Sequence, residues 1–243
     1  DIIINLAAQA GVRHSLENPY VYIKSNILGQ VNLFELARKL NVKKFIYASS
    51  SSVYGGNKVL PFSVKHRVDN PISLYAASKK STELIAEYYS KLYKIKSIGL
   101  RFFTVYGPWG RPDMATFIFT KNILENKPIQ IFNFGKMKRD FTFVDDIVSG
   151  IYGAIKFNPK QFHKIYNLGN SKSELLLEFI KLIEDNLGKN AKKKLLPLQP
   201  GDVTATFANI SESQKDLKFK PKIKITVGIP KFISWYKKYY KIP

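Results

Sequence analysis

Cysteine is absent from the 243 residues of the sequence. Disulfides and thiolate metal ligands both require the cysteine sulfur, so neither can form in this chain. A cysteine-free composition is compatible with a cytosolic protein, and we expect a cytoplasmic location. We also expect no metal site.

Long apolar runs are absent too. No run approaches the roughly 20 residues that a helix needs to span a bilayer. The N-terminal apolar stretch has no basic segment before it, which distinguishes it from a secretory signal. We therefore expect an ordinary globular protein with no integral membrane segment. With 45% hydrophobic residues, the chain can bury one large core or two small ones.

Acidic residues are scarce beside basic ones: 18 Asp and Glu against 39 Lys and Arg give a net charge of +21. Such a charge suits nucleic acid or an anionic membrane surface as a partner. The alternative is a compositional bias, because the lysines are scattered and no dense basic run accompanies a nucleic-acid-binding motif. We favour the bias and expect no nucleic acid partner. The aromatic end of the chain is expected to form a helix that packs Phe232, Trp235 and Tyr239 inward, rather than a membrane-surface helix.

A glycine-rich loop that could bind a dinucleotide is missing as well. Neither G-x-G-x-x-G nor G-x-x-G-x-x-G occurs in the sequence, and the chain opens inside a strand pattern. We interpret the chain as the N-terminally truncated remainder of a longer protein, with the front half of its sheet absent.

Strands and helices alternate in the first 108 residues. Apolar strand patterns cover residues 1–8, 43–49 and 96–103, and helical periodicity covers residues 20–41 and 73–93. Ser73 is the expected N-cap of the second helix. Short strands separated by helices of this length predict an α/β fold with a doubly wound parallel sheet covered on both faces.

After Pro108 the pattern loosens into a smaller α+β portion. We expect short strands at residues 128–135, 139–144, 164–169 and 192–198, capped helices within 111–126, 145–157 and 173–188, and a last pair of helices. Asp145 is an expected cap, and Gly188 an expected helix end. We divide the chain into residues 1–108 and 109–243, with about 139–168 returning to the first part.

Tyr75 and Lys79 lie four residues apart in the expected helix, and therefore on one face of it. A phenol is a poor base at neutral pH because its pKa is near 10. A nearby ammonium favours the phenolate and lowers that pKa, so the pair could move a proton off a carbinol. The alternative is a tyrosine that simply packs on a neighbouring helix.

Four serines, Ser49 to Ser52, end the strand at residues 43–49. In open α/β sheets ligands bind beyond the carboxyl ends of the strands, which is where this run lies. A serine there could bridge the phenol of Tyr75 and a substrate. The alternative is a capped turn, since serine commonly bonds local backbone groups.

Four segments occur together and in order: "YASSSSVYG", "PISLYAASKK", "LRFFTVYGPWGRPDMA" and "RDFTFVDDIV". In this combination the chain resembles the extended short-chain dehydrogenase/reductases, the NAD-dependent epimerase/dehydratase family. It is most similar to the UDP-glucuronate 4-epimerases that feed capsule and lipopolysaccharide synthesis. The resemblance runs from "NLAAQAGVRHS" to "QPGDVTATFANIS".

The resemblance implies a cofactor, NAD, and a Rossmann-like domain in residues 1–108, with UDP-sugar binding mainly in 109–243. Its catalytic residues fall on Ser50, Tyr75 and Lys79. The residues implied at the cofactor are Ala7 and Ala8 at the pyrophosphate and ribose, Asn26 in support, Tyr75 and Lys79 at the nicotinamide ribose, and Phe103 beside the nicotinamide. Which serine is catalytic is settled only to within one position.

The resemblance also implies a UDP-sugar site. Ser51 and Ser52 would meet the sugar, Arg139 the diphosphate, and Asp202 the uridine ribose. A guanidinium suits phosphate oxygens because its donors form a fork. The alternative for Arg139 is an ion pair with Asp140, and for Asp202 a turn after Pro200 and Gly201.

Thr104 and Arg111 match residues that contact the sugar carboxylate in the glucuronate epimerases. Oxidation at carbon 4 yields a β-keto acid, which loses carbon dioxide when its C–CO₂ bond aligns with the ketone π system. Clamping the carboxylate prevents that alignment. The alternative for Arg111 is an ion pair with Asp113. Ser51 and Ser52 stand where related 4,6-dehydratases carry an Asp-Glu pair, which disfavours dehydration.

We therefore expect the parent protein to interconvert UDP-glucuronate and UDP-galacturonate through a 4-keto intermediate, as an NAD-dependent isomerase. Rival activities are the decarboxylation of UDP-glucuronate and the 4-epimerisation of UDP-glucose or UDP-N-acetylglucosamine. A non-enzymatic alternative is a catalytically dead fragment, and we expect this polypeptide to be inactive by itself. The helices that carry Asn26 and Tyr75 resemble the dimer-forming pair of the family, which implies a homodimer.

Overall fold

A computed structural model describes residues 1–199 and 202–242. The chain divides into two compact units. The first consists of Asp1–Phe103, Ser149–Leu168 and Ala208–Phe219, and the second of Thr104–Val148, Gly169–Phe207 and Lys220–Pro243. Each unit is built around its own apolar core and is described by itself.

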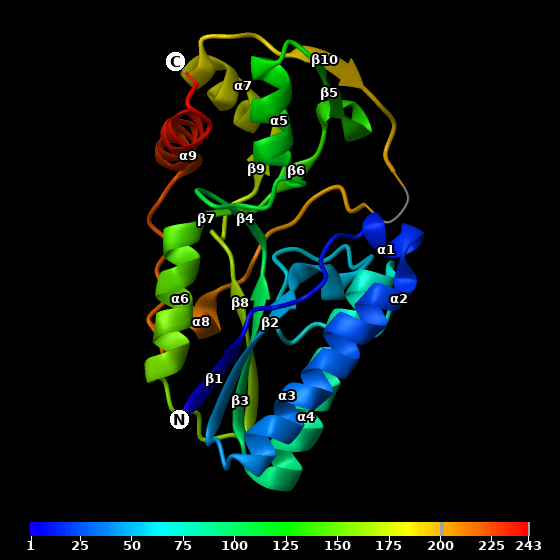
Figure 1. The fold of residues 1–243 in the computed structure, drawn as a ribbon, viewed down its shortest axis with the longest axis vertical. Helices are drawn as coiled ribbons and strands as arrows, with labels where there is room; N and C mark the ends of the chain where they lie inside the picture. The colour runs from blue at the N-terminus through cyan, green and yellow to red at the C-terminus, as the bar shows by residue number, and fades with distance from the viewer. Residues whose placement is uncertain (200–201, 243) are drawn as a thin grey trace. The chain divides into compact units, whose positions relative to one another are not determined.

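A parallel four-stranded sheet forms the centre of the first unit, in the order β1-β2-β3-β8 (Figure 1). Its strands are β1 (Ile2–Asn5), β2 (Lys44–Ser50), β3 (Lys96–Phe102) and β8 (His163–Leu168). The two inner strands are buried almost throughout, as expected when helices cover both faces of a parallel sheet. The doubly wound α/β arrangement predicted from the sequence is confirmed.

Two long helical segments lie side by side on one face of this sheet (Figure 1). One segment is made of α1 (His14–Glu17), α2 (Pro19–Tyr22), the π-helix η1 (Ile23–Leu28) and α3 (Gly29–Lys39), in that order. The other is the single helix α4 (Leu74–Tyr93). Ser73 caps α4 as predicted, because its hydroxyl accepts a hydrogen bond from the Ala76 amide at 3.1 Å. Helix α8 (Ser211–Leu217) contacts β8.

The expectation of one regular helix over residues 20–41 is wrong in its middle. There η1 widens the turn to the π form, so the periodicity that the sequence predicts is interrupted between α2 and α3. Apolar spacing does not distinguish a π turn from an α turn over six residues. Single π turns are frequent at functional sites, and this one carries the buried Asn26.

A glycine in the middle of β3 makes room for a tyrosine of the neighbouring strand. Gly99 pairs with Tyr47 in the sheet, and a Cβ at position 99 would come within 2.5 Å of the Tyr47 hydroxyl oxygen. The Tyr47 ring therefore crosses β3, and its hydroxyl lies 2.9 Å from His163 Nε2 on β8. On the other edge of the same core, Phe34 stacks on Phe45 at 4.1 Å. Tyr47 thus links β2, β3 and β8, and Phe34 packs α3 on β2.

In its described residues, the second unit holds three short strand pairs, four α-helical segments and one 3₁₀ turn. β4 (Thr104–Tyr106) pairs with β7 (Phe141–Phe143), β5 (Pro128–Ile131) with β10 (Lys192–Leu195), and β6 (Lys138–Arg139) with β9 (Glu174–Leu175). The helices are α5 (Ala115–Leu124), the first part of α6 (Val144–Lys156), α7 (Leu176–Leu187) and α9 (Ile225–Tyr240). The short 3₁₀ turn η3 (Phe132–Gly135) follows β5, and η2 (Ser51–Tyr54) lies in the first unit.

Several predicted helix ends differ from the structure. Asp145 lies inside the first turn of α6, which begins one residue earlier at Val144. Helix α7 begins at Leu176 without a side-chain cap, because Glu174 and Leu175 form strand β9 instead. It does end at Gly188, whose φ of 64° is left-handed. Phe232 of α9 packs inward as predicted, but Tyr239 is 51% exposed. No helix in the described ranges is long and apolar enough to cross a bilayer.

Candidate functional site

The serine run divides its side chains between the two faces of the sheet. Successive residues of a strand point in opposite directions, so Ser49 and Ser50 cannot serve the same face. Ser49 is buried, and its hydroxyl donates to the Glu83 carboxylate of α4 at 2.6 Å. Arg101, which pairs with Ser49 in the sheet, donates two further bonds of 2.8 Å to that carboxylate. Ser49 therefore serves the core.

Ser50 closes the turn that follows β2. Its hydroxyl oxygen accepts from the Ser52 amide at 3.1 Å, and its proton is donated to the Ser52 hydroxyl at the same distance. The 3₁₀ turn η2 follows and ends at Gly55, where a Cβ would come within 2.3 Å of the Asn70 carbonyl oxygen. Ser50, Ser51 and Ser52 thus lie at the carboxyl end of β2. The capped turn of the alternative interpretation is present, and it is made by the same serine that the family resemblance assigns to catalysis.

Tyr75 and Lys79 lie on the first two turns of α4, facing the same end of β2. The Lys79 side chain is 4% exposed, and its ammonium donates to the Ala48 carbonyl at 2.9 Å. Tyr75 is half-buried, with its ring edge against Tyr22 at 6.1 Å. Burial lowers the pKa of Lys79 to about 8, because desolvation disfavours the ammonium form. Lys79 therefore presents a buried cation to the end of β2, one helical turn after Tyr75 along α4.

Asn26 of the π-helix joins the loop after β1 to α4. Its amide oxygen accepts from the Gln9 amide at 2.8 Å, and its nitrogen donates to the Gln9 carbonyl at 3.0 Å and to the Ser78 hydroxyl at 2.9 Å. The Ser78 hydroxyl in turn donates to the Tyr75 carbonyl at 2.9 Å. Both donor hydrogens of Asn26 are therefore engaged in holding protein segments together.

The loop after β1 offers small, exposed side chains next to this linkage. Ala7 and Ala8 are exposed, and the Ala7 amide donates to the Asn5 side chain at 3.2 Å. Tyr22 fixes the next part of the loop, because its hydroxyl lies 2.7 Å from the Gly11 carbonyl oxygen. Phe103 is buried at the end of β3, 6.3 Å from the ring of Tyr54. A backbone with only methyl side chains permits close approach of a ligand.

A buried polar row under the strand ends was not anticipated. Arg101 lies 4.9 Å over the Tyr54 ring, and the Tyr54 hydroxyl donates to Asn167 at 2.6 Å. Ser49, Arg101 and Asn167 are register partners across β2, β3 and β8, and all three are buried. The available sequence signal was a polar residue near the carboxyl end of each apolar strand. Glu83, four residues after Lys79, completed that pattern.

In the second unit, Thr104 and Arg139 occupy neighbouring strand positions. Thr104 begins β4, and its amide donates to the Asp140 carbonyl at 3.1 Å. Arg139 is half-buried on β6, and its guanidinium donates to the Lys138 carbonyl at 2.9 Å. The segment that follows Asp202 runs beside β6, since the Lys138 amide donates to the Thr204 carbonyl at 2.9 Å. The structure therefore brings the segments that carry these three residues together.

Arg111 shows the local contact that the alternative interpretation predicted. The Asp202 amide donates to the Gln199 carbonyl at 3.2 Å; Pro200 and Gly201, on which the alternative for Asp202 rests, lie outside the described residues. Arg111 forms an exposed, two-pronged ion pair with Asp113, with 3.0 Å between its Nε and one carboxylate oxygen. An exposed pair of this kind is worth about 0–1 kcal/mol, so it can be exchanged for another carboxylate.

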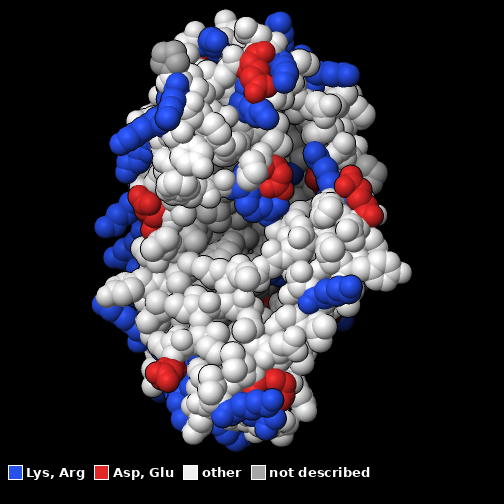
Figure 2. Space-filling model, in the orientation of Figure 1, with Lys and Arg blue, Asp and Glu red and all other residues white. Residues whose placement is uncertain are grey.

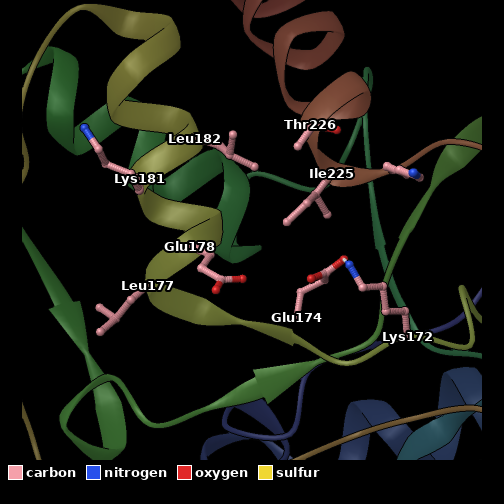
Figure 3. A pocket seen from close by; sticks show the side chains of 9 residues that line it. Lys172, Glu174, Leu177, Glu178, Lys181, Leu182, Ile225 and Thr226 are labelled. Carbon is pink, nitrogen blue, oxygen red and sulfur yellow. Dashed lines mark ion pairs between the residues drawn. The ribbon is translucent and has the colours of Figure 1, made fainter.

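None of the predicted site residues lines either of two hollows in the described part of the chain. One, of about 530 Å³, lies between the first turns of α7 and α9 (Figure 3), and Glu174 and Lys172 pair beside it at 2.8 Å. The other, of about 420 Å³, is lined by the loop between η2 and α4. Lys and Arg occur in several separate groups on the face in Figure 2. Within residues 1–199 and 202–242, no cluster of three or more His, Asp or Glu could hold a metal ion.

The buried ammonium of Lys79 predicts a stability cost that a neutral side chain removes. Below about pH 8, Lys79 is charged in both the folded and the unfolded chain, so the desolvation penalty, on the order of 3 kcal/mol, is complete. We expect Lys79→Met to raise the free energy of unfolding at pH 7 by about 1–3 kcal/mol, since the lost bond to Ala48 offsets part of the gain. Urea titrations followed by circular dichroism measure the change.

The same prediction has a pH signature. As the pH rises from about 8 towards 10.5, the folded chain has lost the Lys79 proton while the unfolded chain retains it, so the wild type gains stability relative to Lys79→Met. The control is Lys91→Met on the same helix, where the side chain is exposed and a change below about 0.5 kcal/mol is expected. A Lys79→Met chain that is less stable than wild type at pH 7 contradicts the prediction.

The chain is similar to known proteins over almost its whole length. The NAD dependent epimerase/dehydratase family matches residues 1–169. An uncharacterized protein of Methanocaldococcus jannaschii is 57% identical over 237 residues, covering 97% of this chain and 72% of that protein. UDP-glucuronate 4-epimerase 5 of Arabidopsis thaliana is 47% identical over 255 residues, covering 98% of this chain and 58% of the plant protein.

A solved structure agrees in fold over almost the whole chain. It is UDP-glucuronic acid 4-epimerase from Bacillus cereus in complex with UDP-glucuronic acid and NAD, with a TM-score of 0.93 and 34% identity. The match covers 99% of this chain and 76% of that one. The Rossmann-like fold and the family resemblance expected from the sequence are both confirmed. The chain belongs to the NAD-dependent epimerase/dehydratase family.

Proposed function

We propose that this chain carries the catalytic core of an NAD-dependent 4-epimerase of UDP-hexuronates, which interconverts UDP-glucuronate and UDP-galacturonate. The observation that carries the proposal is the buried Lys79, which follows Tyr75 by one helical turn on α4 and is bonded to the end of β2 beside the serine run. The likeness to glucuronate 4-epimerases in sequence and in fold supports the choice of reaction. A role in capsule or lipopolysaccharide precursor synthesis and a cytoplasmic location remain predictions.

Tyr75 is the base in the proposed reaction. Its phenolate takes the proton of the sugar 4-hydroxyl while hydride leaves carbon 4, and NAD⁺ supplies the hydride acceptor when bound. The Ser50 hydroxyl shares the hydrogen bond to the same oxygen; for this it exchanges its present bond to Ser52. Rotation of the keto sugar about its diphosphate link presents the other face, and hydride returns there. The sugar therefore undergoes no net oxidation.

Lys79 makes the phenol of Tyr75 a usable base. With a pKa of about 8, most Lys79 side chains are charged at pH 7, so the ammonium can stabilise the phenolate. Burial strengthens that stabilisation because little water screens the two groups. We propose that the Lys79 ammonium exchanges the Ala48 carbonyl for the nicotinamide ribose when cofactor is bound.

The other residues proposed to serve the cofactor are Ala7, Ala8, Phe103 and Asn26. Ala7 and Ala8 suit the cofactor pyrophosphate and ribose, because their small methyl side chains allow the backbone to come close to these groups. Phe103 would lie beside the nicotinamide. Asn26 acts through its bonds to Gln9 and Ser78, and so positions the cofactor loop against α4. We assign NAD binding to residues 1–108 with the returning segment 139–168, and UDP-sugar binding mainly to 109–243.

The residues proposed to bind the UDP-sugar are assigned by the chemistry of their side chains. Arg139 pairs with the diphosphate and Asp202 with the uridine ribose, while Ser51 and Ser52 meet the sugar. Thr104 and Arg111 hold the hexuronate carboxylate out of line with the 4-ketone. The exposed pair between Arg111 and Asp113 supports this role, because the substrate carboxylate can replace Asp113 at small cost.

A homodimer is proposed through α3 and α4. Large apolar side chains that a monomer leaves exposed recur on α4 at a spacing of four residues, at Leu84, Tyr88 and Leu92. Leu36 of the adjacent α3 and Leu40, which follows its last residue, are also exposed. Two copies of such a helix pair can bury these side chains against each other, as four helices packed face to face.

The reaction itself gives the first test. NMR of UDP-glucuronate incubated with the complete gene product is expected to show UDP-galacturonate, with NAD retained by the protein. Tyr75→Phe should lower kcat by about 100-fold or more, because it removes the proton acceptor while leaving the ring. Tyr20→Phe, a tyrosine that is 76% exposed, is the matched control and should keep activity. Release of carbon dioxide as the main outcome, or turnover of UDP-glucose or UDP-N-acetylglucosamine alone, contradicts the proposed substrate.

The inactivity of the 243-residue polypeptide by itself is a separate prediction. No G-x-x-G-x-x-G loop occurs in its sequence to surround the dinucleotide pyrophosphate. We expect the purified polypeptide to contain no NAD after gel filtration, measured by absorbance of the acid-released nucleotide. Stoichiometric NAD in that preparation contradicts the prediction without affecting the assignment of the reaction.

The dimer predicts the effect of a charge on the α4 stripe. Tyr88→Glu is expected to yield a monomer in sedimentation equilibrium, since it places a carboxylate in the apolar contact. Tyr152→Glu on α6 is the matched control, because Tyr88 and Tyr152 are similarly exposed, at 59% and 56%. The control should remain dimeric. Equal masses for wild type and both variants rule out this interface.

A further inference from the structure

The loop that carries Arg111 is closed by two turns of its own backbone. This loop, Gly107–Met114, joins β4 to α5, and we refer to it as the Arg111 loop. The Gly110 amide donates to the Gly107 carbonyl at 3.2 Å, and the Met114 amide donates to the Arg111 carbonyl at the same distance. Gly107 has a φ of 144°, and a Cβ there would come within 2.6 Å of Val144 Cγ1. The loop is therefore fixed at its start by backbone geometry.

Trp109, at the tip of this loop, has an unusual conformation. Its φ is 61°, in the left-handed region, and the residue is 74% exposed. A bulky residue at positive φ is strained by about 1–2 kcal/mol, so other contacts must hold it there. Two aromatic residues of α9 supply them: the ring centroid of Trp109 lies 5.4 Å from Trp235 and 5.1 Å from Tyr239.

The α9 side of this contact is anchored in the core of the second unit. Trp235 and Tyr239 are one helical turn apart and stack at 5.4 Å with 23° between their planes. Trp235 also lies 5.7 Å from Phe232, which is buried. We call the three rings of Trp109, Trp235 and Tyr239 the aromatic clamp. The clamp ties the tip of the Arg111 loop to a helix that packs on the core.

We propose that the aromatic clamp is a positioning and specificity element, which holds the Arg111 loop so that the guanidinium meets a hexuronate carboxylate. The proposal rests on the function proposed above for Arg111. Arg111 is two residues from Trp109, so freeing the tip frees the guanidinium as well. An exposed ion pair with Asp113 is too weak to fix the loop by itself. Trp235 and Tyr239 act on the substrate only through Trp109.

A loose clamp has two chemical consequences. The ratio of kcat/KM for UDP-glucuronate to kcat/KM for UDP-glucose declines, because Arg111, the residue that distinguishes the two substrates, is misplaced. The 4-keto intermediate also decarboxylates more often: the bond from carbon 5 to the carboxylate breaks, carbon dioxide leaves, and the electron pair enters the ketone as an enolate. The enolate then takes a proton from water and yields a UDP-4-keto-pentose. Neither effect is expected from a general loss of stability.

The experiment compares four variants of the complete gene product. Tyr239→Leu is expected to lower kcat/KM for UDP-glucuronate by about 10-fold or more, since misplacement of a binding group by about 1 Å can cost 100-fold. Its kcat/KM for UDP-glucose should change less than about 2-fold, and carbon dioxide per turnover should rise. Tyr239→Phe keeps the ring and should restore wild-type behaviour. Tyr152→Leu on α6 is the matched control, because Tyr152 is 56% exposed, close to the 51% of Tyr239, and its ring lies 4.3 Å from the Lys156 ammonium rather than against the clamp. Arg111→Ala is the reference.

Fluorescence reports on the clamp without any substrate. The sequence contains only two tryptophans, Trp109 and Trp235, and both belong to the clamp. In the 243-residue polypeptide, excitation of tryptophan therefore reads the clamp alone, and Tyr239→Leu should shift the emission to longer wavelength while Tyr152→Leu does not. Equal losses of activity on both substrates, or an unchanged carbon dioxide yield with shifted emission, overturn the proposal.

The reference variant separates this proposal from the one it rests on. If Arg111→Ala removes the preference for UDP-glucuronate and Tyr239→Leu does not, the clamp has no role in specificity. If the wild type shows no preference for UDP-glucuronate, or Arg111→Ala leaves the preference unchanged, the function proposed for Arg111 is wrong and the clamp's role in specificity is wrong with it.

Discussion

Burial of a single ammonium organises the first unit. Lys79 lies almost without water between α4 and β2, and desolvation lowers its pKa to about 8. A charge so placed must be hydrogen-bonded, and the Ala48 carbonyl meets that need by drawing the helix onto the strand end. One turn earlier on the same helix stands Tyr75. The contact that compensates a buried charge therefore also holds the turn of α4 that carries Lys79 at the carboxyl end of β2.

The polar row beneath that contact keeps the strand ends in register. The Glu83 carboxylate accepts hydrogen bonds from Ser49 of β2 and from Arg101 of β3, and all three side chains are buried. A buried ion pair adds little net stability, but removal of one partner leaves an uncompensated charge that costs about 3–5 kcal/mol. Such a network tolerates one arrangement only. It fixes which way Ser49 points, and so leaves Ser50 to the opposite side.

Two other positions gain their meaning from neighbours distant in the sequence. Asn26 contacts Gln9 and Ser78, which are 17 and 52 residues away. Trp109 adopts a strained backbone because Trp235 and Tyr239 hold it. In each case a long-range contact fixes a local conformation beside a residue assigned to the reaction. The two cases lie in different units, Asn26 in the first and Trp109 in the second.

Sequence pattern alone predicted much of the framework. Apolar strands of β-branched residues, the Ser73 cap and the glycine after α7 are local signals, and local signals survive in the sequence because they act over a few residues. The four-residue spacing of Tyr75 and Lys79 belongs to the same class. The π turn, the absent cap of α7 and the early start of α6 escaped prediction, since tertiary contacts and strand pairing decided them.

The sequence by itself determined the alternation of strands and helices, the family, and the residue types available at the strand ends. Only the tertiary structure decided the division of labour among them. It placed Ser49 in the core with Glu83, gave Ser50 the turn, and joined Trp109 to α9. The physical reason is that burial and hydrogen-bond partners arise when segments far apart in the chain meet. The periodicity of two or 3.6 residues that marks a strand or a helix does not indicate which distant segments come into contact.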